Sequence, residues 1–122
     1  MSDIMLASRI AAILSRCQIS LSSEEAAHRD ILKAILAEGL PAQSEVRLDA
    51  KSRIDLMVGG VGIEIKVGRS HSRRDVMAQL TRYAQFPQVT ALILATGSPW
   101  PKSITHAGEK RLFMVDLSMG WL

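Results

Sequence analysis

The sequence predicts a single α/β domain with a mixed β-sheet flanked by helices, with elements in the order α-α-β-β-β-α-β-β. Three patterns carry this prediction. Apolar residues recur at helical spacing in the first third of the chain, polar and apolar residues alternate around a Gly-Gly pair, and a nearly continuous apolar run of strand length follows later. The chain has 122 residues, enough to bury one core, so we expect one domain spanning residues 1–122.

Two helices are expected first. Residues 3–16 show apolar side chains at near-helical spacing. Ser22 followed by Glu25 three positions later is a capping-box pattern, which predicts a second helix that runs to about Glu38 and ends at Gly39. The apolar residues that this helix is expected to bury are Leu32, Ile35 and Leu36.

Three strands are expected next, over residues 45–49, 53–56 and 61–67, because polar and apolar residues alternate in the first two and the third is mostly apolar. A helix over about 73–86 follows, ended by Pro87.

The remaining chain predicts two further strands. Residues 89–95 form the nearly continuous apolar run, which is typical of a strand covered on both faces. Residues 97–108 read as a loop, and residues 111–117 as a last strand near an edge of the sheet.

Composition narrows the class of protein. No apolar run reaches the roughly 18 residues that span a bilayer, and the N-terminus lacks a signal-peptide pattern, so we expect no membrane association. Cys17 is the only cysteine and cannot form an internal disulfide. We therefore expect a cytoplasmic setting, in a bacterium or a phage-infected host.

Positive charge gathers in one segment of this mildly basic chain, whose net charge is +3. On charge alone, this segment is either a surface that faces nucleic acid or a solvated helix start. No aromatic residue lies among its arginines before Tyr83, so the segment has few aromatic side chains on which the bases of a single strand could stack. The basic residues are Lys66, Arg69, Arg73, Arg74 and Arg82, against the single acid Asp75.

The predicted hairpin carries charges inside strands that are otherwise apolar. If Gly59-Gly60 is a two-residue turn, Asp55 lies opposite Glu64; if the loop extends to Gly62, Asp55 lies opposite Lys66. Both registers place Asp55 on the same face as Glu64 and Lys66, and only an odd-length loop or a bulge would separate them.

Opposed carboxylates on a strand pair repel each other and need a cation. Carboxylates with water and a backbone carbonyl suit Mg²⁺ or Mn²⁺, and the carbonyl of Ile65 lies between the two charged residues of its strand. The alternative is a solvated face on which Lys66 pairs with Asp55.

Asp55, then Glu64-Ile65-Lys66 on a hairpin behind a Glu-containing helix, resembles the active site of the PD-(D/E)XK nuclease superfamily, which has the restriction-endonuclease-like fold. Gln79-Leu-Thr-Arg-Tyr83 resembles the Q-x-x-x-Y element of RecB-type members. The amino-acid sequence of the hairpin resembles that of small stand-alone members of the superfamily from phages and prophages. Ile54 stands where the named proline would be, at a position without a chemical role. The likeness covers about residues 22–96.

The resemblance implies that Asp55 and Glu64 bind the metal and that Lys66 orients the attacking water and offsets charge in the transition state. Glu24 and Glu25 compete for a further acidic ligand. We favour Glu24, because the capping box explains Glu25.

Gln79 and Tyr83 either face the catalytic carboxylates or the DNA, or form a hydrogen bond that only supports the fold. The expected DNA contacts, which position phosphates without reading sequence, are Arg53, Arg69, Arg73 and Arg74.

By resemblance, we expect a Mg²⁺-dependent deoxyribonuclease, with Mn²⁺ able to substitute, in phage or prophage DNA replication, recombination or repair. Without a further domain to read sequence, we expect structure-selective or nonspecific cleavage. A homodimer is also expected. The alternative is a non-catalytic DNA-binding or assembly module with the same fold.

Overall fold

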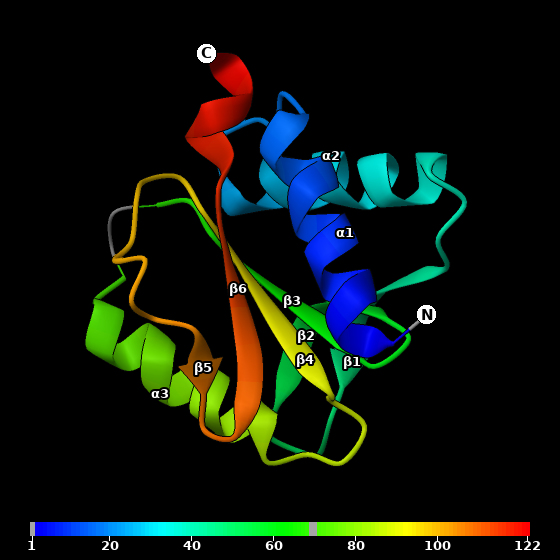
Figure 1. Ribbon diagram of the computed structural model, residues 1–122, viewed down its shortest axis with the longest axis vertical. Helices are drawn as coiled ribbons and strands as arrows, with labels where there is room; N and C mark the ends of the chain where they lie inside the picture. The colour runs from blue at the N-terminus through cyan, green and yellow to red at the C-terminus, as the bar shows by residue number, and fades with distance from the viewer. Residues whose placement is uncertain (1, 69–70) are drawn as a thin grey trace.

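The computed structural model describes residues 2–68 and 71–122, which form one mixed six-stranded sheet covered by helices on both faces (Figure 1). The elements are α1 (Asp3–Arg16), α2 (Glu24–Ala37), β1 (Ala42–Arg47), β2 (Arg53–Val58), β3 (Val61–Lys66), α3 (Arg73–Ala84), β4 (Ala91–Thr96), β5 (His106–Ala107), β6 (Lys110–Asp116) and the 3₁₀ helix η1 (Leu117–Trp121).

The predicted α/β class with a mixed sheet is confirmed. The strand order is β1-β2-β3-β4-β6-β5: β1, β2 and β3 run antiparallel, β3, β4 and β6 run parallel, and β5 pairs antiparallel with β6. The sequence did not predict β5 or η1. β5 has two residues and η1 is one short 3₁₀ turn, too short for a periodic pattern.

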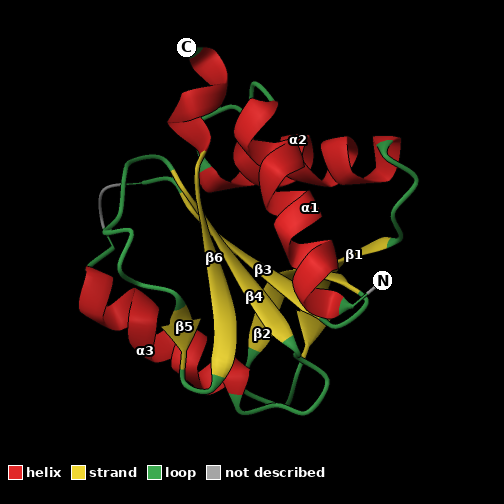
Figure 2. Ribbon diagram, viewed as in Figure 1, coloured by secondary structure: helices red, strands yellow, loops and turns green. Residues whose placement is uncertain are grey.

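Two hydrophobic clusters lie on opposite faces of the sheet. Ile10, Leu14 and Ile31 pack from α1 and α2 against one face, and Leu80 and Tyr83 pack from α3 against the other (Figure 2). Every residue of β4 is buried, as the continuous apolar run predicted for a strand covered on both sides. Among the described residues, no helix is long and apolar enough to cross a membrane.

The start of α2 differs from the prediction. Ser23, not Ser22, is the N-cap, and its side chain accepts a hydrogen bond from the N–H of Ala26. The capping box with Glu25 is therefore wrong. The buried face of α2 also differs from the prediction: it runs through Ala27, Ile31 and Ile35, and Leu36 is 50% exposed.

The first strand also differs from the prediction. β1 begins at Ala42 and ends at Arg47, earlier than the predicted 45–49. Glu45 in its middle has a φ of +53°, a left-handed conformation that interrupts the regular alternation on which the predicted bounds depended.

The hairpin between β2 and β3 closes through the two-residue turn Gly59-Gly60, with Val58 opposite Val61. Gly59 has a φ of +58°, which a residue without a side chain adopts readily. The first of the two predicted registers is therefore the one observed.

The carboxyl ends of β3 and β4 lie side by side because these strands are parallel and Lys66 is paired with Thr96. At Gly97, an added Cβ would lie 2.9 Å from the carbonyl oxygen of Val67, so only glycine permits this approach. The segments that follow the two strands consequently meet at one edge of the molecule.

Candidate active site

The β2–β3 ladder opens where the charged residues lie. Regular pairing ends at Leu56 and Ile63. Beyond this pair, the N–H of Ile65 donates to Asp55 Oδ2 at 2.8 Å, and the N–H of Asp55 donates to Glu64 Oε1 at 3.3 Å. The two carboxylates thus accept hydrogen bonds that carbonyl groups accept in a continuous ladder.

Side-chain alternation in β2 reverses at Asp55. Leu56 packs in the cluster under α1 and α2, and regular alternation would place Ile54 there too. Ile54 packs instead in the α3 cluster, where an added Cβ on Gly62 would lie 2.5 Å from Ile54 Cδ1. Asp55 therefore does not simply share a face with Glu64, as the regular register predicted; the two meet across the opening between the strands.

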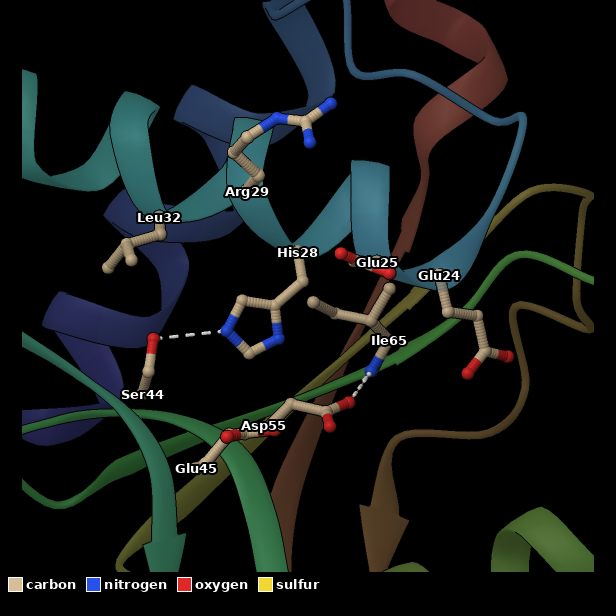
Figure 3. Close-up of a pocket in the computed structure, with 9 residues that line it drawn as sticks. All are labelled: Glu24, Glu25, His28, Arg29, Leu32, Ser44, Glu45, Asp55 and Ile65. Atoms are coloured by element: carbon tan, nitrogen blue, oxygen red, sulfur yellow. Dashed lines mark hydrogen bonds between the residues drawn. The ribbon is translucent and has the colours of Figure 1, made fainter.

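Asp55 lines a cavity of about 630 Å³ beneath α2 (Figure 3). Acidic residues dominate its lining, and the Ile65 backbone lies beside the Asp55 carboxylate. His28 Nε2 and Ser44 Oγ are 3.0 Å apart, which ties α2 to β1 at one side. The lining residues are Glu24, Glu25, His28, Arg29, Leu32, Ser44, Glu45, Asp55 and Ile65.

Glu64 is only 3% exposed. Burial and, to a smaller extent, the nearby Asp55 carboxylate raise the pKa of Glu64 to about 8, against the opposing effect of Lys66. Lys66 Nζ lies 3.3 Å from Glu64 Oε2. Lys66 therefore pairs with Glu64. The alternative prediction, a solvated face on which Lys66 pairs with Asp55, is not what the structure shows.

Glu24 and Glu25 both line the cavity beneath α2. Glu24 Oε1 is hydrogen-bonded to His71 Nε2, which joins the start of α2 to the segment before α3. Figure 3 shows the Glu24 side chain extending away from the helix. With the capping box removed, the choice between the two glutamates rests on this contact, and it favours Glu24 as the residue nearer the charged edge of the sheet.

The donor set fits a hard divalent cation of the Mg²⁺ type. Mg²⁺ is bound through one or two carboxylates and keeps several waters, and the Asp55 and Glu64 carboxylates with the Ile65 carbonyl match that chemistry. Within residues 2–68 and 71–122, no three His, Cys, Asp or Glu side chains lie close enough to hold an ion together. Glu24 is therefore not close enough to Asp55 and Glu64 for the three side chains to bind one ion directly.

Gln79 and Tyr83 form a relay from α3 to β2. Gln79 Nε2 donates to Tyr83 Oη at 2.8 Å, and Tyr83 Oη donates to the carbonyl of Arg53 at 2.9 Å. Tyr83 is 1% exposed, and burial together with the Glu64 charge raises its pKa to about 12. This geometry corresponds to the supporting role; the hydroxyl holds the strand two residues before Asp55.

The predicted DNA contacts are spread over the surface. Arg53 is exposed at the start of β2, and Arg73 and Arg74 are exposed at the start of α3. Arg73 lines a cavity that it shares with Lys66. Arg69 lies outside the described residues.

His71 and Trp100 are residues that the sequence analysis missed. His71 contacts Glu24, and Trp100 lies under Arg73, whose Cζ is 5.5 Å from the centre of the indole ring. The parallel pairing of β3 and β4 brings both residues to the charged edge. Neither residue could be named from the sequence, because the segments after two strands meet at one edge of a sheet only where those strands pair in parallel.

No protein-family model matches the chain, and searches of curated proteins and of solved structures found no match either. A functional proposal therefore rests on the geometry of this site.

Proposed function

We propose that the protein is a metal-dependent nuclease that hydrolyses phosphodiester bonds in DNA. One observation supports this most: the ladder opens at Asp55 and Glu64, and the two carboxylates fill the opening beside Lys66. A buried carboxyl next to a second carboxylate is expensive to ionise without a cation. An arrangement that brings them together is explained by a bound cation.

Asp55, Glu64 and the Ile65 carbonyl would hold the ion, with Glu24 acting through water. When bound, a divalent cation offsets charge on the phosphate and lowers the pKa of the attacking water. Mg²⁺ suits this oxygen donor set, and Mn²⁺ substitutes for it.

Lys66 supplies a fixed positive charge at the same point. Its ammonium lies 3.3 Å from Glu64, and its side chain is 15% exposed. Its role is to orient water by hydrogen bonding and to stabilise negative charge that develops on the phosphate.

The DNA would be held without reading its sequence, because arginines at the start of α3 and β2 contact phosphates. The cleavage would be structure-selective or nonspecific, in phage or prophage DNA metabolism by the resemblance. The second candidate, a non-catalytic DNA-binding module, lacks a reason to bring Asp55 and Glu64 together.

The test is cleavage of a panel of end-labelled DNAs: duplex, nicked, flap, junction and single-stranded, with Mg²⁺ or Mn²⁺. Wild type should cut at least one of them, and Asp55→Asn and Lys66→Ala, purified identically, should fall to background. Glu38→Gln, which changes an exposed acid at the end of α2, should cut like wild type. Equal cleavage by wild type and Asp55→Asn would assign the activity to a contaminant. Binding without cleavage of any substrate would favour the non-catalytic module.

A further inference from the structure

A second cavity, of about 320 Å³, lies beyond Lys66 from the two carboxylates. Its size is at the lower end of cavities that hold small ligands, roughly 300–1,000 Å³. Segments after β3 and after β4 build its walls. The lining residues are Lys66, Val67, Gly68, His71, Arg73, Gly97, Ser98 and Trp100.

The two cavities differ in charge. The cavity beneath α2 has four acidic lining residues, Glu24, Glu25, Glu45 and Asp55, against Arg29 and His28. The second cavity has Lys66, His71 and Arg73, and none of its described lining residues is acidic. The charges therefore favour an anion in the second cavity and a cation in the cavity beneath α2. Both cavities lie at the same edge of the sheet.

Arg73 is already held in place for such an anion. Its Nη2 donates to the carbonyl of Pro99 at 3.5 Å, and its guanidinium lies over the Trp100 ring. A side chain fixed before binding loses less conformational entropy when a ligand arrives. Arg73 also begins α3, so the positive end of the helix dipole lies at the rim of the cavity.

The fold gives the cavity a rigid base. Thr96 Oγ1 donates to the carbonyl of Ser98 at 2.7 Å and shapes the turn after β4. Gly97 permits the close contact with Val67 described above. The base of the cavity therefore lies at the carboxyl ends of β3 and β4, and the segments that follow these two strands form its walls.

We propose that this cavity binds a phosphate group of the DNA strand, as part of one nucleotide unit adjacent to the bond placed at Asp55 and Glu64. Lys66, His71 and Arg73 hold the phosphate, and Trp100 lies beside the nucleoside. This inference rests on the proposed function for its ligand, but binding of a single nucleotide is measured without metal and without cleavage.

The probe is thymidine 5′-monophosphate in EDTA, followed through the indole N–H signals of the two tryptophans in ¹H–¹⁵N spectra. Trp100 should shift on titration. Trp121, whose Nε1 donates to the carbonyl of Ile19, serves as an internal control and should not. Thymidine, which lacks the phosphate, should bind far more weakly, and inorganic phosphate should displace the nucleotide.

The matched variants are Arg73→Ala and Arg9→Ala, which remove the same charge from exposed positions of α3 and α1. Arg73→Ala should weaken nucleotide binding about tenfold or more, the loss expected for a charged hydrogen bond, and Arg9→Ala less than about twofold. Thermal melting of both variants checks that they remain folded.

Three results would overturn the assignment: no Trp100 shift at tens of millimolar nucleotide, equal binding of thymidine, or equal weakening by both arginine variants. Nucleotide binding without any DNA cleavage would remove the nuclease proposal and leave this site. Metal-dependent cleavage without nucleotide binding would remove only this inference.

Discussion

Glu64 is buried beside a second carboxylate, so its charge is unfavourable until a proton or a cation compensates it. In the proposed nuclease site, this unfavourable charge would become favourable when a divalent ion binds. The same property makes the metal-free protein sensitive to pH.

We expect Glu64→Gln to stabilise the metal-free protein increasingly as pH rises. The pKa of Glu64 is about 8 in the folded protein and 4.5 in the unfolded chain. Between these two pH values the folded wild type holds more protons than the unfolded chain, so its stability falls as the pH rises. Glutamine does not titrate and keeps an oxygen for the Asp55 N–H. The difference should be near zero at pH 4.5 and reach a few kcal/mol at pH 9, at about 1.4 kcal/mol per pKa unit.

Urea unfolding in EDTA across this pH range measures that difference. Glu38→Gln is the control and should track wild type at every pH. A constant offset between Glu64→Gln and wild type would mean that Glu64 does not change protonation on folding.

Tyr83→Phe should destabilise the protein by about 1–3 kcal/mol, because it leaves the buried Arg53 carbonyl without its donor. Gln79→Ala should cost less when Tyr83 is already Phe, since the hydroxyl it contacts is gone. Chemical denaturation of the two single variants and the double variant gives this coupling. Additive losses would show that the relay is not one unit.

At the scale of the elements, the reversal of β2 at Asp55 depends on Ile54 crossing Gly62. Gly62→Ala should cost about 1–3 kcal/mol, because its Cβ would meet Ile54 Cδ1 at 2.5 Å. Ile54→Val removes that atom, so the double variant should be more stable than the sum of the two single losses by at least about 0.5 kcal/mol.

The control for this cycle is Ile93→Val, at an equally buried position on the opposite face. It should add to Gly62→Ala without coupling. Additivity with Ile54→Val as well would place the Ile54 side chain elsewhere and remove the explanation for the position of Asp55.

The sequence predicted what local patterns determine. The periods of α1, α3 and β4 and the Gly59-Gly60 turn follow from residues close in the chain, and they were right in kind. The sequence could not distinguish Ser22 from Ser23 as the N-cap of α2, because adjacent serines carry the same hydroxyl group. The reversal at Asp55 was not predictable, because it depends on the left-handed Glu45 and on a contact with Gly62 from another strand.

The same division holds for the candidate site. Asp55, Glu64 and Lys66 could be named because charges inside apolar strands are visible in one hairpin. His71 and Trp100 could not, since only the pairing of β3 with β4 brings them beside Lys66. The sequence placed aromatic side chains away from the arginines, whereas the fold stacks Arg73 on Trp100.

At the scale of the whole molecule, two cavities of different charge lie at consecutive residues of β3: Ile65 lines the first cavity, which contains four acidic residues, and Lys66 lines the second, basic cavity. A DNA strand that crosses this edge would place one phosphate near the carboxylates and another against Arg73. The first placement requires a cation, because a phosphate and two carboxylates repel each other. Metal binding is therefore a property that the whole arrangement predicts.

Mg²⁺ or Mn²⁺ should raise the melting temperature of wild type by several degrees, since a ligand at 100 times its Kd adds about 2.7 kcal/mol. The increase should be larger at pH 8.5 than at pH 6.5, because Glu64 must lose its proton before it can bind the ion. Calorimetric titration in two buffers of different ionisation enthalpy should detect that proton below pH 8. Asp55→Asn should lose most of the increase, and Glu38→Gln should keep it. An equal increase in Asp55→Asn would place the metal outside the opening between β2 and β3, and the nuclease proposal would lose its main support.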